Sequence, residues 1–281
     1  MNNIQDRISL PNGTTIPCVG FGTWKTPAEQ ASASVAAALA AGYRHIDTAT
    51  AYRNEAAVGE ALAASGVPRG EYFLTTKLWN PDQGYETTLA ACDRSLQALG
   101  TDYVDLYLIH WPCDPKYFTN WKDVNLETWR AFEELYRAGK VRAIGLSNFR
   151  QEHIENILSS CTIAPMVEQI ELHPGMTQDD TVAFCRAHGM VIEAWSPLGS
   201  GRVFQAPEMQ ALAAKYGRTI AQICLRWSVQ HGFVPLPKSV TPSRIEENMH
   251  LFDFELDEAD MRLLDTLDIG WSGLDPYDLK Y

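Results

Sequence analysis

Eight short apolar runs, separated by helical patterns, restrict most strongly what this chain can fold into. Most of them lack strict alternation of apolar and polar residues, as expected when a parallel strand is buried on both faces. Alternating strands and helices give a parallel sheet, either doubly wound or closed into a barrel. Eight units favour a (β/α)8 TIM barrel. The runs are residues 18–21, 43–46, 72–76, 104–109, 141–146, 165–167, 190–194 and 233–236.

The strand–helix units follow one another without a linker, a low-complexity segment or a break in composition. We therefore expect a single barrel domain over residues 1–281. Before the first unit, Asn12-Gly13 between two short strand patterns predicts an N-terminal β-hairpin with a type I′ turn, capping the bottom of the barrel. Extra helices are expected near the C-terminus, at residues 208–216 and 220–230 and after Thr241 and Asp257.

Composition restricts the classes of partner. The formal net charge of −12 at pH 7 disfavours binding to nucleic acid or to anionic membranes, which need a basic surface. Residues 1–7 are polar and lack the apolar core of a secretory signal, and no stretch approaches the length of a membrane span. No two of the six cysteines have C-x-x-C spacing. We expect a cytoplasmic protein and, without an exposed apolar stripe, a monomer.

Polar residues lie at the ends of successive apolar runs. Asp47, Lys77 and His110 each follow such a run, and Tyr52 comes five residues after Asp47. In a parallel barrel these strand ends point to the face where active sites form. A nearby ammonium favours the phenolate, so we expect Lys77 to lower the pKa of Tyr52 and Asp47 to hold Lys77 in place. Tyr52 would then donate a proton to a developing alkoxide, and His110 would orient a carbonyl.

A second candidate site follows the last apolar run. Lys238 and Arg244 flank a helix start at residues 241–242. Free backbone N–H groups at such a start, together with two cations, would hold a phosphate. The early glycine motif at residues 20–22 has Lys25 where a dinucleotide fingerprint needs its third glycine, so a doubly wound dinucleotide fold is unsupported.

With these residues in place, the chain resembles the aldo-keto reductase family along essentially its whole length. Residues 42–55, 145–149 and 236–248 resemble three signatures of the family, and they occur in the same order as in the family. The pattern is similar to the microbial branch related to diketogluconate reductases. The resemblance implies a catalytic tetrad that consists of Asp47, Tyr52, Lys77 and His110.

The resemblance also implies NADPH (NADP⁺) rather than NADH, because Lys238 and Arg244 supply charge for an extra phosphate. The carboxamide of the nicotinamide would be held by Ser147, Asn148 and Gln169. The full set of implied cofactor-binding residues is Thr23, Trp24, Ser147, Asn148, Gln169, Trp195, Ser196, Pro197, Leu198, Ser200, Lys238, Ser239, Val240, Thr241, Arg244, Glu247 and Asn248. Two positions depart from the family: Trp195 replaces a frequent tyrosine, and Glu168 replaces a common asparagine.

An aromatic pocket at the mouth of the barrel would receive a small carbonyl compound. The segment 114–125 and the short tail are the expected specificity loops. The implied substrate-binding residues are Trp24, Trp79, His110, Trp111, Phe118, Trp121 and Trp271.

We therefore expect NADPH-dependent reduction of an aldehyde or ketone to an alcohol, with Tyr52 as the acid and no metal. One alternative is a regulatory or redox-sensing subunit on the same fold, which binds the cofactor with little turnover; the intact tetrad argues against it. Another is a metal-dependent barrel hydrolase using His110, His173 and Asp47. No serine elbow and no His-x-x-x-His pair supports hydrolysis.

Overall fold

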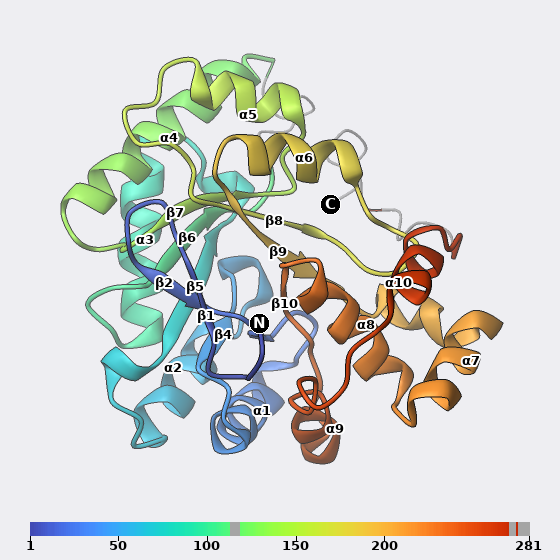
Figure 1. Ribbon diagram of the computed structural model, residues 1–281. Helices are drawn as coiled ribbons and strands as arrows, with labels where there is room; N and C mark the ends of the chain where they lie inside the picture. The colour runs from blue at the N-terminus through green and yellow to red at the C-terminus, as the bar shows by residue number, and fades with distance from the viewer. Residues whose placement is uncertain (113–118, 270–273, 275–281) are drawn as a thin grey trace.

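The computed structural model describes residues 1–112, 119–269 and 274, and its eight parallel strands curl into a closed barrel (Figure 1). Hydrogen bonds of 3.0 Å from Gly20 N to Pro235 O and from Gly22 N to Pro237 O join the first strand to the last. The predicted (β/α)8 fold is confirmed. The strands are β3 (Phe21–Gly22), β4 (His45–Asp47), β5 (Phe73–Leu78), β6 (Leu106–Ile109), β7 (Ile144–Ser147), β8 (Val167–Glu171), β9 (Val191–Trp195) and β10 (Val234–Pro235).

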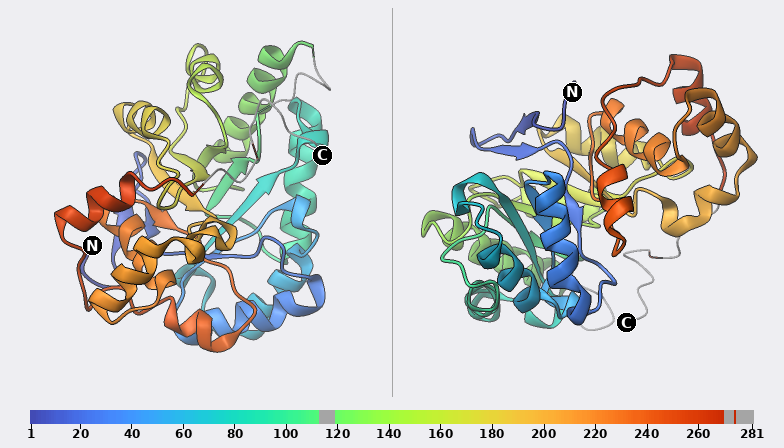
Figure 2. Two further views of the ribbon diagram at one scale, coloured as in Figure 1. Left: turned by 90° about the vertical axis from the view of Figure 1, so that its right-hand side faces the viewer. Right: turned by 90° about the horizontal axis from the view of Figure 1, so that it is seen from below.

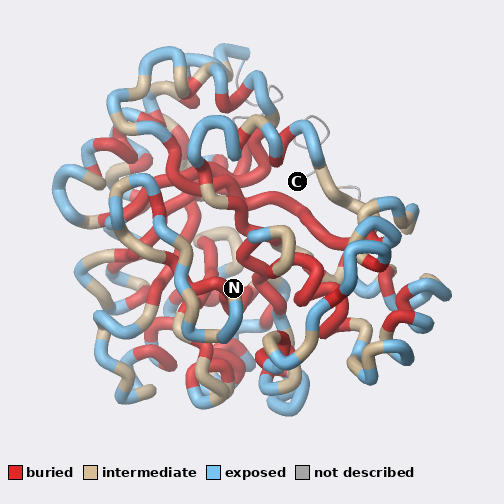
Figure 3. Tube along the Cα trace, viewed as in Figure 1, coloured by how far each residue is buried: buried red, intermediate tan, exposed pale blue. Residues whose placement is uncertain are grey.

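Helices surround the barrel, with their exposed faces outward and the strands buried inside (Figures 2 and 3). The extra helices expected near the C-terminus are present, two of them between β9 and β10. Within the described residues, no helix is both long and apolar enough to cross a membrane. The helices are α1 (Ala28–Ala41), α2 (Glu55–Ala64), α3 (Tyr85–Leu99), α4 (Trp121–Arg137), α5 (Gln151–Leu158), α6 (Asp179–Ala187), α7 (Pro207–Tyr216), α8 (Ile220–Gln230), α9 (Pro242–Glu247) and α10 (Glu258–Asp265).

The predicted N-terminal hairpin is present as antiparallel β1 (Arg7–Ser9) and β2 (Thr15–Pro17), but its turn is not type I′. A type I′ turn needs a positive φ at both central residues. Gly13 has a φ of 83°, whereas Asn12 does not lie in the positive region. Gly13 N instead donates to Leu10 O at 2.9 Å, which closes a longer loop.

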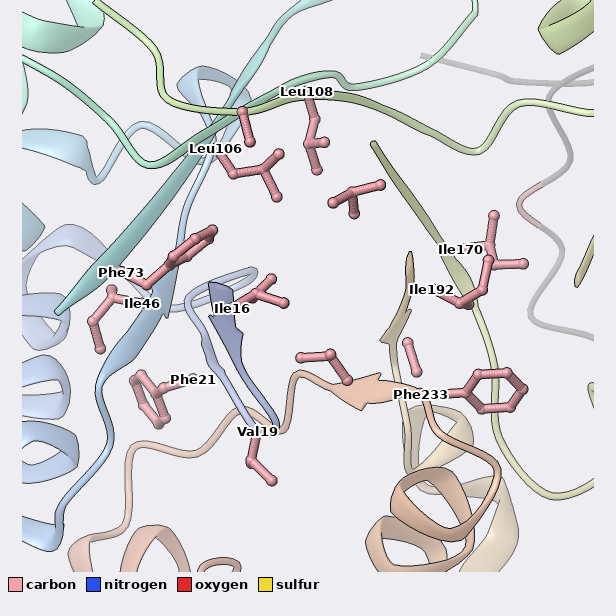
Figure 4. Close-up of a cluster of buried hydrophobic side chains, with 14 of the residues drawn as sticks. Ile16, Val19, Phe21, Ile46, Phe73, Leu106, Leu108, Ile170, Ile192 and Phe233 are labelled. Carbon is pink, nitrogen blue, oxygen red and sulfur yellow. The ribbon is translucent and has the colours of Figure 1, made fainter. Parts of the chain in front are cut away.

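The hairpin closes the bottom of the barrel. Ile16 of β2 is fully buried and belongs to the same apolar cluster as Phe73 and Leu106, the first residues of β5 and β6 (Figure 4). Because these residues begin their strands, the cluster lies at the N-terminal ends of the barrel. The opposite, C-terminal ends are therefore left for polar side chains.

Candidate active site

The four residues of the predicted tetrad meet at the C-terminal ends of neighbouring strands. Asp47 ends β4, Lys77 lies near the end of β5, and His110 directly follows β6. Tyr52 ends the short helix η1 (Thr50–Tyr52), just after β4. Lys77 Nζ lies 2.6 Å from Asp47 Oδ1 and 3.4 Å from the Tyr52 hydroxyl. The rings of Tyr52 and His110 meet edge to face, with their centroids 5.5 Å apart.

Lys77 is completely buried, and its ammonium uses all three N–H groups. Besides Asp47 and Tyr52, it donates to the backbone oxygen of Thr48 at 3.0 Å. Burial disfavours the charged form, but the negative charge of Asp47, followed by the interaction with Tyr52, outweighs burial and raises the pKa of Lys77. The amine therefore stays positively charged beside the phenol.

The expectation that Lys77 lowers the pKa of Tyr52 below its ordinary value is wrong for this structure. Burial raises the pKa of Tyr52 to about 12, and the nearby charge of Lys77 offsets only part of that effect. The cause is the cost of removing a phenolate from water, which the sequence does not reveal. At neutral pH Tyr52 consequently keeps its proton and can still donate it.

We expect the phenol of Tyr52 to titrate above pH 10. An unfolded tyrosine ionises near pH 10, so stability contributed by this group is present below pH 10 and is lost as pH rises toward about 12. NMR of protein labelled with ¹³C at the tyrosine ζ carbon measures the titration, and loss of one signal in Tyr52→Phe assigns it. A midpoint at or below about pH 9 would contradict the burial argument.

His110 is a neutral imidazole at physiological pH. Burial, and then the charge of Lys77, lower its pKa well below the ordinary value. Its Nδ1 atom is buried and accepts or donates no hydrogen bond within the described residues. A neutral ring can donate one hydrogen bond to a carbonyl oxygen without changing its charge.

Asn54 holds the loop that carries Tyr52. Its side-chain nitrogen donates to the backbone oxygens of Thr23 and Thr26, both at 3.1 Å, and its oxygen accepts from the Thr48 hydroxyl at 2.9 Å. Asn54 is buried and therefore ties the loop after β4 to the loop after β3. Its occurrence in the first family signature was the only sequence signal for this positioning function.

The residues predicted to hold the nicotinamide form one hydrogen-bonded group beside the tetrad. Ser147 pairs with Gln169 in the register of β7 and β8, and its hydroxyl donates to Gln169 O at 2.8 Å. The Asn148 amide donates to Ser147 Oγ at 3.0 Å and to His110 O at 2.9 Å. Trp195 Nε1 donates to Asn148 Oδ1 at 2.8 Å, which fixes the orientation of the indole.

Three further tryptophans, from the loops after β3, β5 and β6, lie near Trp195 and the tetrad. Trp24 and Trp195 meet edge to face with centroids 6.0 Å apart, and Trp79 lies 5.3 Å from the ring of His110. Trp111 is buried directly after His110. The ring contacts place Trp24, Trp195 and Trp79, and its position next to His110 places Trp111, at the same end of the barrel as the tetrad.

Other predicted substrate residues are not brought to the tetrad by any described contact. Trp121, at the start of α4, packs edge to face on His153 of α5 at 5.2 Å. Phe118 and Trp271 lie outside the described residues. The part they and the specificity loops play therefore stays a prediction.

The loop after β9 carries four of the implied cofactor-binding residues: Ser196, Pro197, Leu198 and Ser200. Ser196 and Ser200 have φ values of 46° and 53°, in the left-handed region that non-glycine residues rarely adopt. Their hydroxyls are 3.5 Å apart, so the loop folds back on itself. Pro197 is buried and Leu198 is half-buried between them. Thr23, also predicted to contact the cofactor, donates its hydroxyl to Asp47 O at 3.0 Å.

The predicted phosphate site lies between β10 and α9. Lys238 and Arg244 are exposed and form no ion pair within the described residues. Although Lys238 is exposed, partial desolvation of its ammonium, and then the charge of Lys25, lower its pKa, so a second lysine lies within electrostatic reach of it. In a chain of net charge −12, this arrangement fits an anionic group.

The remaining residues of this segment are placed as follows. Ser239 Oγ accepts from Thr241 N at 3.1 Å, so that backbone donor is already used. The Glu247 carboxylate accepts from a threonine hydroxyl at 2.9 Å. Val240 is exposed and Asn248 is buried. The Ser239 hydroxyl donates to Thr241 O at 3.5 Å, so the charged side chains of Lys238 and Arg244, rather than this hydroxyl or the amide of residue 241, are left to bind a phosphate.

Sequence reasoning missed two buried polar residues beneath the tetrad. His45 and Glu193 are completely buried in β4 and β9, and Glu193 Oε2 accepts from Gln169 Nε2 at 2.8 Å. Their signal was an ionisable residue within an apolar run. Glu168, noted as a departure from the family, accepts from Phe149 N at 2.9 Å, and burial raises its pKa well above the ordinary value.

Comparison with known proteins agrees with this geometry. The family model described as "Aldo/keto reductase family" matches residues 18–269, and the chain belongs to that family. It is 48% identical over 266 residues to the glyoxal reductase of Bacillus subtilis, covering 94% of each chain. The structure of an aldo/keto reductase from Brucella melitensis matches with a TM-score of 0.89 at 47% identity, covering 95% of this chain and 100% of the other. A mutant of the protein named Gox0644, solved in complex with NADPH, matches with a TM-score of 0.91 at 42% identity, covering 99% of each chain.

Proposed function

We propose that this protein reduces an aldehyde or ketone to an alcohol with NADPH, and that Tyr52 is the general acid. The observation that carries the proposal is the buried ammonium of Lys77, 2.6 Å from Asp47 and 3.4 Å from the Tyr52 hydroxyl, at the active-site end of the barrel. Membership of the aldo/keto reductase family supports it. So do a relative named glyoxal reductase and a similar structure that contains NADPH.

The residues present fit NADPH at both ends of the molecule. Ser147, Asn148 and Gln169 offer polar groups for the carboxamide, and the indole of Trp195 lies beside them to stack on the ring. Lys238 and Arg244, cations without a partner in the described chain, would bind the 2′-phosphate. When bound, the cofactor supplies a hydride to the carbonyl carbon.

The chain itself supplies the proton and holds its source. Tyr52 donates its hydroxyl proton to the oxygen of the substrate as negative charge develops there. The phenolate that remains is stabilised by Lys77, whose position is fixed by Asp47. His110, as a neutral ring, donates a hydrogen bond to the same oxygen and orients the carbonyl. Trp24, Trp79 and Trp111 exclude water from the apolar part of the substrate.

The hydrolase alternative is not favoured by the geometry. The His173 ring lies 2.9 Å from the backbone oxygen of Pro174 and 3.2 Å from Glu171, not beside His110. In the described ranges, no three His, Cys, Asp or Glu side chains are grouped as metal ligands. Activity that survives a strong chelator would exclude this alternative.

Cofactor oxidation tests the proposal directly. NADPH absorbance is followed with dicarbonyls, aromatic aldehydes and ketones, beside parallel reactions with NADH. We expect turnover of at least one class, faster with NADPH. Tight NADPH binding without oxidation by any carbonyl would instead indicate the regulatory or redox-sensing subunit.

A further inference from the structure

The side chain of Gln169 crosses the interior of the barrel just below the tetrad. It projects from β8, and its Nε2 donates to Asp47 Oδ2 of β4 at 2.9 Å and to Glu193 Oε2 of β9 at 2.8 Å. Glu193 faces Gln169 directly in the register of the two strands. All three side chains are buried. The amide nitrogen is thus held between two carboxyl groups.

The two carboxyl groups determine that the nitrogen of the Gln169 amide, and not its oxygen, faces Asp47 and Glu193. A primary amide has two N–H groups, and here both are used. The reversed amide would place its oxygen against the acceptor oxygens of Asp47, which is unfavourable without a donor. The remaining hydrogen-bonding capacity of the side chain therefore lies on its oxygen, Oε1.

We propose that Glu193 is a positioning residue for cofactor binding: together with Asp47 it fixes the Gln169 amide so that Oε1 accepts a hydrogen bond from the carboxamide NH₂ of the nicotinamide. This inference rests on the proposed function, because it takes the partner of Gln169 to be NADPH. It adds a function for Glu193: this residue, without touching the cofactor, determines that Gln169 presents its oxygen and not its nitrogen to the carboxamide.

Asp47 alone would not fix the amide. Its other oxygen is bound by Lys77 at 2.6 Å, and a single acceptor leaves the terminal torsion of a glutamine broad and the second N–H free. Glu193 supplies a second acceptor from another strand, which stops that rotation. The pair therefore acts as a two-point clamp.

The clamp works whether or not Glu193 is ionised. Burial, and then the charge of Asp47, raise the pKa of Glu193 to about 8, and a neutral carboxyl still accepts through its carbonyl oxygen. His45 Nε2 lies 3.6 Å from the other oxygen of Glu193. Burial lowers the pKa of His45 to about 3, so its ring is neutral and does not draw the carboxyl away as an ion would.

A cofactor analogue isolates the proposed hydrogen bond. The 3-acetylpyridine analogue of NADP⁺ has a methyl group in place of the carboxamide NH₂ and keeps the carbonyl. Dissociation constants of NADP⁺ and the analogue are measured by quenching of tryptophan fluorescence, with no turnover. We expect the wild-type protein to bind NADP⁺ about tenfold more tightly than the analogue, the value of one hydrogen bond.

Variants at Glu193 test whether this residue positions the Gln169 amide. Glu193→Met removes the acceptor at similar volume, and we expect its ratio of the two dissociation constants to fall to about one. Glu193→Gln keeps an acceptor oxygen and should keep the wild-type ratio. Glu193→Ala is measured beside them in case methionine prevents folding. Because each ratio compares two ligands on one sample, a change in the folded fraction alone does not move it.

The outcomes separate this inference from the proposed function. A wild-type ratio near one, or a wild-type ratio retained in Glu193→Met or Glu193→Ala, would overturn the clamp while leaving NADPH binding intact. Loss of the ratio in Glu193→Gln as well would overturn the acceptor argument. A wild-type protein that binds neither nucleotide would overturn the proposed function and the clamp with it.

Discussion

Replacing Tyr52 by phenylalanine is expected to lower kcat for carbonyl reduction by about 10²–10⁴-fold, the usual contribution of a positioned general acid. The ring remains, so its contact with His110 is kept, but the proton donor 3.4 Å from Lys77 is lost. NADPH affinity should change little, because the phenol is not among the groups proposed to bind the cofactor. Steady-state kinetics and fluorescence titration with NADPH measure the two effects separately.

Tyr107→Phe is the matched control for this variant. Tyr107 is a completely buried tyrosine of β6 whose hydroxyl has no hydrogen-bond partner in the described part of the chain. It stacks on Phe132 of α4, outside the barrel interior. The same loss of a hydroxyl should leave kcat unchanged there. A Tyr52→Phe enzyme as fast as the wild type would show that another group supplies the proton.

The barrel was predictable because its signal repeats. All eight apolar runs correspond to observed strands. The predicted boundaries were less accurate where a strand carries polar residues. The run at residues 165–167 predicted a strand that the structure places at Val167–Glu171, as β8. Glu168, Gln169 and Glu171 are buried in that strand. Apolarity identifies strands well until a barrel uses its strand ends for chemistry.

The positions of the tetrad were predictable, but its electrostatics were not. Strand ends of a parallel barrel meet at one face, so Asp47, Lys77 and His110 were expected to converge there. Whether Lys77 or burial dominates the pKa of Tyr52 depends on how much water reaches the hydroxyl. That quantity arises from packing of the whole fold, and here burial outweighs the ammonium.

The interior network needed coordinates for a similar reason. His45 and Glu193 each lie inside an apolar run, where a single ionisable residue gives no indication of its partner. The contact between Gln169 of β8 and Asp47 of β4 crosses the barrel and joins residues far apart in the sequence. Only closure of the sheet brings such strands face to face.

Replacing Lys238 and Arg244 together by alanine is expected to weaken NADPH binding by about 100-fold. Charge-assisted hydrogen bonds contribute roughly 1.5–3 kcal/mol where they are protected from solvent. Both side chains are exposed, so screening places each at the weaker end, about tenfold. NADH lacks the 2′-phosphate and should lose little affinity. Titrating NADPH and NADH into the wild-type and variant proteins gives the ratio of their dissociation constants, and we expect this ratio to change about 100-fold in the variant.

Arg130→Ala with Lys140→Ala is the matched control for that loss of two positive charges. Arg130 lies on α4 and Lys140 just after it, on the opposite side of the molecule from α9 (Figure 1). This variant should bind both cofactors as the wild type does, because a charge beyond about 10 Å is largely screened at 0.1 M salt.

Raising the salt concentration should reduce the preference of the wild-type protein for NADPH over NADH, since screening weakens exposed contacts with a phosphate. Equal losses for NADPH and NADH in the Lys238 and Arg244 variant would show that these cations do not recognise the 2′-phosphate.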